Sequence, residues 1–94
     1  MKKPESNKQK IIDNYCLDEE TQFMFMDGFD DAILGIVESF GSEQKVCYDK
    51  NKVIKILQKQ GMTYEEAYEW YDYNIIGAYV GEKTPIFMER IKDI

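Results

Sequence analysis

Apolar side chains in the second half of the chain recur at the three- and four-residue spacing of a helix. This pattern predicts a helix over residues 50–60, with Asp49 as its N-cap and Gly61 just after its end. A second helix is expected from residue 64 to about residue 77 or 79, so that the two form a helical hairpin. The apolar positions on the buried sides are Val53, Ile54, Leu57, Tyr64, Ala67, Tyr68, Tyr71, Ile75 and Ala78.

The second helix has a recognisable start. Thr63 and Glu66 have the spacing of a capping box, in which the hydroxyl and the carboxylate each accept a hydrogen bond from the other residue's backbone N–H. Met62 and Ala67 occupy the positions of a weak hydrophobic staple around the same turn. The sequence therefore predicts that this helix begins at residue 64.

Strand patterns lie on both sides of the helical hairpin. Residues 45–48 and 86–88 are short apolar runs next to turn residues, as expected of strands. Residues 22–26 also fit a strand. It would end at Asp27-Gly28, a pair typical of a type I′ hairpin turn.

Two further segments are less regular. Residues 29–40 fit one face of a helix, but the apolar run at 32–37, with Gly35 inside it, also fits a buried strand, and we favour the strand. A short helix is expected within residues 11–20. The predicted order is (β)ββααβ, an α+β fold in which a small antiparallel sheet carries a helical hairpin packed on one face.

The length of 94 residues fits one hydrophobic core and leaves no room for a second. Residues 1–10 contain four lysines, Pro4 and no apolar periodicity, so we expect a flexible basic tail there. Residues 11–94 are expected to form a single α+β domain.

Charge is unevenly distributed along the chain, whose net charge is −6. Residues 11–43 contain nine acidic residues and no basic one, whereas residues 44–60 contain five lysines, which we interpret as a solvated helix face. This balance argues against direct nucleic-acid binding, which needs clustered lysine and arginine. An acidic surface either keeps the chain in solution or meets a partner protein with a basic surface.

The sequence lacks the residues and motifs that most often carry out catalysis. There is no histidine, Gly-rich phosphate loop, nucleophile elbow or paired-cysteine metal motif, so we expect neither an enzyme nor a cofactor. No apolar stretch reaches the roughly 18 residues of a membrane span, and the N-terminus lacks the apolar part of a secretory signal. With only Cys16 and Cys47, reduced thiols in the host cytoplasm are the expectation.

One acidic turn is a candidate ligand or cation site. Asp27, Asp30 and Asp31 place three carboxylates around a turn, where oxygen ligands would suit a hard cation or a metal-dependent enzyme. The spacing is not that of an EF-hand loop. The simpler interpretation is that Asp27 makes the turn, while the other two are solvated or cap a helix.

Acidic and aromatic residues share the predicted second helix. Glu65, Glu69 and Asp72 form an acidic ridge at spacings of four and three residues, either a solvated face or part of a docking surface. Trp70 and Tyr73 lie outside the core stripe, in a flanking row with Glu66 and Gly77. Such aromatic residues are common binding anchors, but packing against the rest of the protein is an alternative.

Three motifs resemble a known protein family. They are DGFDDAILG at residues 27–35, GMTYEEA at 61–67 and YNIIGAYVGEKTPIF at 73–87. They look like a family of small uncharacterised proteins encoded by bacteriophages, prophages and some bacteria. The resemblance covers roughly residues 25–89. It implies a phage or mobile-element context and supplies no activity or catalytic residue.

These observations lead to two hypotheses of different class. The first is a non-enzymatic binding protein of a phage or mobile element, such as an acidic counter-defence inhibitor that occupies the basic groove of a host nucleic-acid-binding protein. The second is a protein that sequesters a nucleotide-like ligand, with Trp70 or a tyrosine stacking on the base. In that case Lys50, Lys52 and the N-terminus of the helix after Asp49 would hold the phosphates.

Overall fold

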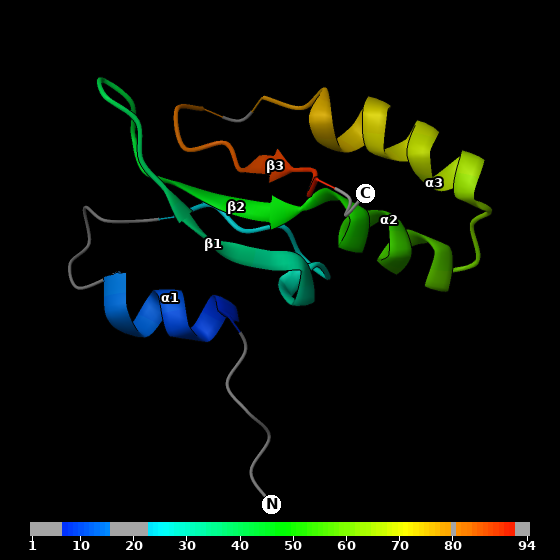
Figure 1. The fold of residues 1–94 in the computed structure, drawn as a ribbon, viewed down its shortest axis with the longest axis horizontal. Helices are drawn as coiled ribbons and strands as arrows, with labels where there is room; N and C mark the ends of the chain where they lie inside the picture. The colour runs from blue at the N-terminus through cyan, green and yellow to red at the C-terminus, as the bar shows by residue number, and fades with distance from the viewer. Residues whose placement is uncertain (1–6, 16–22, 80, 92–94) are drawn as a thin grey trace, which may run out of the picture.

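A three-stranded mixed sheet forms the centre of the fold (Figure 1). The computed structural model describes residues 7–15, 23–79 and 81–91. Strand β1 (Ile33–Val37) pairs antiparallel with β2 (Lys45–Asp49), and β3 (Ile86–Met88) pairs with the other side of β2. The α+β fold with strand, strand, helical hairpin and strand in that order is therefore confirmed.

The direction of β3 corrects one part of the prediction. β3 runs parallel to β2, so the sheet is mixed and not antiparallel throughout. The cause is visible in Figure 1: the second helix of the hairpin runs back along the sheet, and the following loop reverses the chain before β3. Parallel neighbours require a crossover of this kind, which the helical hairpin provides.

The segment before β1 departs from the expected hairpin. Residues 23–26 belong to no strand, and the backbone N–H of Met26 donates instead to the hydroxyl of Tyr48 at 2.7 Å. Asp27 and Gly28 do form a turn, but only Gly28 has a positive φ, 85°, which excludes a type I′ geometry. The short 3₁₀ turn η1 (Asp30–Ala32) then leads into the strand favoured for this region.

The two helices of the hairpin begin where their capping residues predicted. In α2 (Lys50–Lys59) the side chain of Asp49 accepts hydrogen bonds from the backbone N–H groups of Asn51 and Lys52. The capping box before α3 (Tyr64–Trp70) is also confirmed. The sequence did not predict that α3 continues as a π-helical turn, η2 (Tyr71–Ile76).

An additional helix, α1 (Asn7–Tyr15), lies beside β1 (Figure 1). The side-chain amide of Asn7 donates to the carbonyl of Ile33 at 2.8 Å, and Ile11 is buried in the core. Residues 7–10 were expected in the flexible tail and are helical. Residues 11–15 of α1 belong to the helix that was expected within residues 11–20. The remainder of that helix, residues 16–20, lies outside the described residues, as do residues 1–6 of the expected tail.

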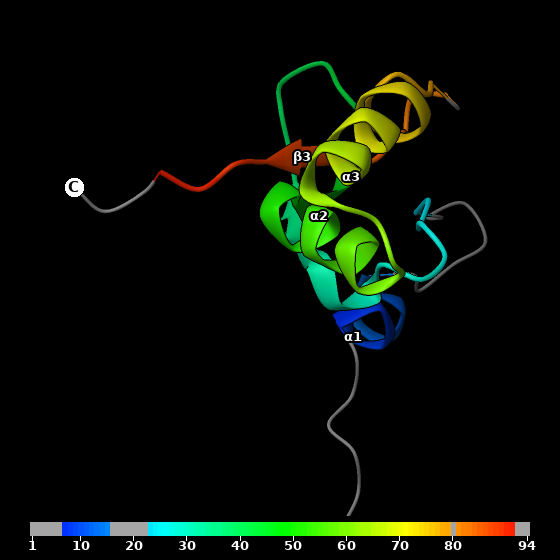
Figure 2. The ribbon, with the colours of Figure 1, turned by 90° about the vertical axis from the view of Figure 1, so that its right-hand side faces the viewer.

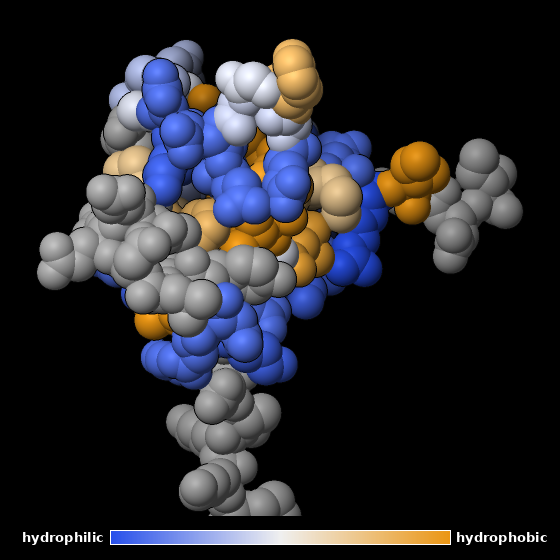
Figure 3. All heavy atoms as spheres, turned by 90° about the vertical axis from the view of Figure 1, so that its left-hand side faces the viewer, coloured by the Kyte–Doolittle hydropathy of each residue, from blue (hydrophilic) through white to orange (hydrophobic). Residues whose placement is uncertain are grey.

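The core lies between the sheet and the helices. Tyr48 and Phe87 are register partners on neighbouring strands, so their rings share the sheet face on which the helical hairpin packs. The ring of Phe87 also contacts that of Tyr71, with centroids 5.5 Å apart. Figure 2 views the molecule from the end of the sheet at which β2 leads into α2, and it shows α2 and α3 side by side there. Figure 3 views the molecule from the opposite end and shows apolar residues bordered by hydrophilic ones. None of the described helices is long and apolar enough to cross a membrane.

Candidate functional site

Three buried side chains fix which residues of α3 and η2 face outward. Ala67, Tyr71 and Ile75 point into the core with at most 7% of their surface exposed. The opposite sides of α3 and η2 therefore carry the acidic ridge and the flanking aromatic row. We call this surface the acidic–aromatic face; it consists of Glu65, Glu66, Glu69, Trp70, Asp72 and Tyr73.

Part of this face surrounds a shallow hollow. Trp70 is 40% exposed and Tyr73 is 84% exposed, so neither aromatic side chain is buried in the core. The hollow has a volume of about 350 Å³. Its lining residues are Met62, Glu66, Glu69, Trp70, Tyr73 and Asn74.

The structure thus joins some of the predicted site residues and separates others. Glu69, Trp70 and Tyr73 line the hollow together, whereas Glu65 and Asp72 are exposed on the same surface without lining it. Met62 and Asn74 were not expected from the sequence to be site residues. Met62 stands in the loop before α3, and its staple position next to the capping box was the signal that could have placed it there.

The π-helical turn sets the position of the aromatic row relative to the core. A wider turn at Tyr71–Ile76 changes the angular spacing of the side chains after Trp70. Gly77 follows this turn, and a Cβ atom there would lie only 3.0 Å from the carbonyl oxygen of Asp72. Glycine therefore allows the backbone to close tightly behind Tyr73.

The carboxylates of the face have no cationic partner within the described part of the chain. The two ion pairs found there, Lys50–Glu89 and Arg90–Asp49, both lie elsewhere. Glu66 also has no cationic partner in that part of the chain, but its carboxylate accepts a hydrogen bond from the backbone N–H of Thr63 at 2.9 Å. This bond lowers the pKa of Glu66. The face therefore carries negative charge that no cation of residues 7–15, 23–79 and 81–91 neutralises through an ion pair.

At the start of α2, by contrast, two of the three groups expected to hold a phosphate are already engaged, and only the exposed side chain of Lys52 has no bond within the described part of the chain. Lys50 donates hydrogen bonds to the hydroxyl of Tyr68 and to Glu89, and its pKa is raised, mainly by the bond to Tyr68. The backbone N–H groups of the first turn are bonded to the carboxylate of Asp49. A phosphate would have to displace the carboxylate of Asp49, which is part of the same chain and next to these N–H groups. This arrangement disfavours the nucleotide-binding hypothesis at this position.

The three aspartates before β1 do not form a cation site. Asp27 and Asp31 are exposed and Asp30 is half-buried. Across residues 7–15, 23–79 and 81–91, no three His, Cys, Asp or Glu side chains gather closely enough to hold a metal ion. The pKa of buried Tyr48 is raised, first by its burial and to a lesser degree by the charges of Asp30 and Asp27.

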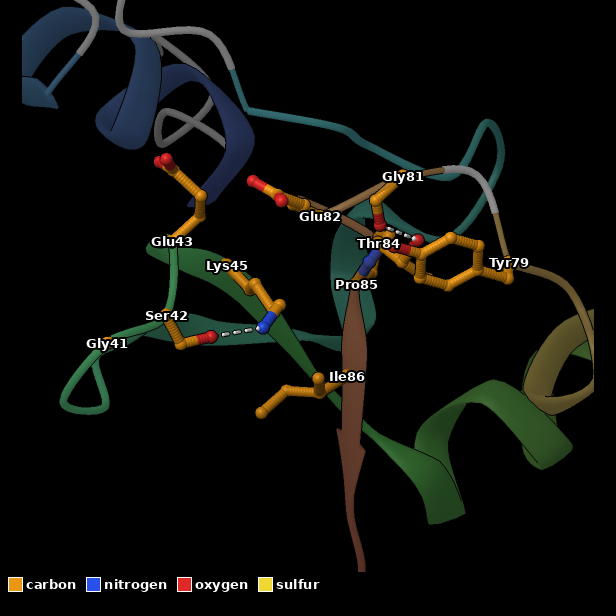
Figure 4. A pocket seen from close by; sticks show the side chains of 10 residues that line it. All are labelled: Gly41, Ser42, Glu43, Lys45, Tyr79, Gly81, Glu82, Thr84, Pro85 and Ile86. Atoms are coloured by element: carbon orange, nitrogen blue, oxygen red, sulfur yellow. Dashed lines mark hydrogen bonds between the residues drawn. The ribbon is translucent and has the colours of Figure 1, made fainter.

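A larger hollow of about 640 Å³ lies between the β1–β2 hairpin and the loop before β3 (Figure 4). Its polar groups bind mainly one another: the ammonium of Lys45 donates to Ser42 Oγ at 2.8 Å, and the hydroxyl of Thr84 donates to the carbonyl of Gly81. Glu43 also lines it, so both signs of charge are present. This mixed lining favours no particular class of ligand.

Cys47 is a buried free thiol on β2. Burial raises its pKa, and the nearby charge of Asp49 adds to the effect. The thiol is therefore kept protonated at neutral pH and is a poor nucleophile.

Comparisons with protein-family models, with curated proteins and with solved structures found no match to this chain. The functional inference therefore comes from the surface chemistry described above.

Proposed function

We propose that this chain is a non-enzymatic binding protein whose acidic–aromatic face docks onto the basic surface of a partner protein. The observation that supports this most is the combination of exposed Trp70 and Tyr73 with carboxylates that have no cationic partner in the described structure. Exposed aromatic rings supply apolar contact area, and the surrounding charge selects a positively charged partner.

The energetics of the helix support the same proposal. Glu65, Glu69 and Asp72 repel one another at spacings of four and three residues, and such pairs slightly destabilise an isolated helix. A partner that brings lysine or arginine to this ridge would relieve the repulsion. The net charge of −6 would also accelerate the encounter with a basic protein.

The biological setting follows from the sequence resemblance to small phage and prophage proteins. In that setting the partner is a host protein that binds nucleic acid, and the carboxylates occupy the lysine and arginine side chains that normally hold phosphate. The protein would then act in the host cytoplasm as a counter-defence inhibitor.

The test is a competition experiment with three forms of the protein. Basic proteins from a bacterial lysate are bound to DNA-cellulose and then challenged with the wild type, with Glu65→Gln/Glu69→Gln/Asp72→Asn, or with a control. The control, Asp27→Asn/Asp31→Asn/Glu43→Gln, removes the same charge at exposed positions outside the face. Mass spectrometry identifies the released proteins.

We expect the wild type and the control to release the same host protein and the ridge variant to release none. Equal release by all three forms would mean that bulk charge, and not this face, is responsible. If no form released any protein, inhibition of a nucleic-acid-binding protein would be refuted.

A further inference from the structure

In the described part of the chain, four aromatic rings have a lysine of the same chain over one face, at 4.6 to 5.6 Å from the ring centroid. The pairs are Lys8 over Phe25, Lys83 over Phe23, and Lys50 over both Tyr68 and Tyr71. Within the described residues no such cation lies over Trp70 or Tyr73.

The charged groups around this hollow are hydrogen-bond acceptors, and so is the amide oxygen of Asn74. Glu66 and Glu69 contribute carboxylates, and only one oxygen of Glu66 is used, by the backbone of Thr63. Asn74 donates its side-chain N–H to the carbonyl of Trp70 at 3.2 Å, which leaves its Oδ1 free as an acceptor. A hollow of this composition attracts a cation rich in donors and repels a phosphate.

Arginine satisfies these conditions better than lysine or a metal ion. Its planar guanidinium can stack on the indole of Trp70 while donating to a carboxylate through two N–H groups, and it has no acceptor of its own. A lysine ammonium has neither the planar stacking surface nor the paired donors. Met62 offers apolar contact for the aliphatic stem of the side chain.

We propose that this hollow receives one arginine side chain of the basic partner, with the guanidinium over Trp70 and paired with Glu69. The proposal rests on the proposed function, because it names the group that the acidic–aromatic face recognises. The hollow of about 350 Å³ accommodates a single side chain and not a folded segment.

The test compares tetra-arginine with tetra-lysine, two peptides of the same charge at neutral pH. Trp70 is the only tryptophan of the chain, so its fluorescence reports binding at the hollow. We expect tetra-arginine to bind about tenfold more tightly than tetra-lysine, since stacking and paired hydrogen bonds are available only to the guanidinium. Glu69→Gln, which removes the carboxylate that pairs with the guanidinium, should lower this ratio towards one, whereas Glu43→Gln, the same change at an exposed position outside the hollow, should preserve it.

Equal affinities for the two peptides would overturn the arginine assignment and leave the proposed function standing. An absence of binding by either peptide, or an arginine preference that survives Glu69→Gln, would overturn it as well. Conversely, a clear arginine preference together with a ridge variant that still releases the host protein from DNA-cellulose would refute the proposed function alone. Circular dichroism confirms folding of both glutamine variants, which change exposed side chains.

Discussion

Two charged regions of the helical hairpin differ in how their charges are used. At the start of α2, Asp49 caps the helix and pairs with Arg90, while Lys50 binds Tyr68 and Glu89. On the acidic–aromatic face the carboxylates of the outward ridge bind no cation of the described chain. The first region joins α2 to α3 and to the segment after β3, whereas the second is directed to the solvent.

The difference separates charges that serve the fold from charges that are available to a partner. Asp49 is only 3% exposed, and a buried carboxylate is tolerated because both of its oxygens have partners. Tyr73, at 84% exposed, has no corresponding role in packing. Substitutions in the two regions should therefore affect different measurements: folding stability in the first and partner binding in the second.

The largest effect on stability is expected from Asp49→Ala. This change removes the N-cap of α2 and leaves Arg90 without its partner, so the free energy of unfolding should fall by about 2 kcal/mol. Urea denaturation measures the loss. Asp72→Ala, which removes an exposed carboxylate from the face, should change stability by less than about 0.5 kcal/mol. Similar losses in the two variants would contradict the comparison.

A smaller loss is expected from Lys50→Met. The hydrogen bond to Tyr68 contributes about 1 kcal/mol, and the pair with the exposed Glu89 adds little. Because the pKa of Lys50 is raised above its ordinary value of 10.5, its contribution is complete below that pH and is lost as the pH rises beyond it. Lys52→Met is the matched control at an exposed position of the same turn.

Urea denaturation of both variants at neutral pH distinguishes the two lysines. We expect a measurable loss for Lys50→Met and an unchanged midpoint for Lys52→Met. If both lost the same stability, the hydrogen bond to Tyr68 would not be the cause.

The ridge variant Glu65→Gln/Glu69→Gln/Asp72→Asn should remain within about 0.5 kcal/mol of the wild type. Relief of like-charge repulsion is offset by loss of the favourable charge of Glu65 in the first turn of α3. The same variant should lose partner binding completely in the competition experiment. A loss of more than about 1 kcal/mol would show that the ridge stabilises the fold.

The smallest effect is expected at Glu66, which belongs to both the face and the capping box. Its pKa is lowered in the folded protein by the N–H of Thr63, so its contribution to stability is present above pH 4.5 and is lost as the pH falls through the lowered value. The wild type should therefore lose stability in acid more steeply than Glu66→Gln. Parallel urea midpoints across pH 4.5 would exclude this coupling.

Local signals allowed much of the fold to be predicted. Asp49, Thr63 and Glu66 act within two or three residues along the chain, and each is bonded as their spacing predicted. The strand at Ile33–Val37 was recognisable from its continuous apolar run. In contrast, the apolar residues 23–26 had a plausible strand pattern, but they belong to no strand, and the backbone N–H of Met26 donates to the hydroxyl of Tyr48.

The candidate site was predicted less completely. Glu69, Trp70 and Tyr73 were expected on one side of the helix, and the structure brings them to one hollow. Whether the two rings would be buried against another element could not be decided from spacing, because burial depends on what packs beside the helix. The π-helical turn was equally hidden, since its residues are compatible with an ordinary α-helix.

The sequence by itself determined where the helices of the hairpin begin, the negative charge of α3, and most of the positions that face the core. Tyr64 and Ala78 were expected on the buried side and are exposed, since they lie at the ends of the second helix. The expected positions that are buried are Val53, Ile54, Leu57, Ala67, Tyr71 and Ile75. These properties depend on neighbours a few positions away, where hydrogen bonds and helical periodicity act directly. Only the tertiary structure decided that β3 runs parallel to β2, that Met26 bonds to Tyr48, and that Trp70 stays exposed. Those outcomes depend on contacts between segments distant in the chain, which form only when the core is packed.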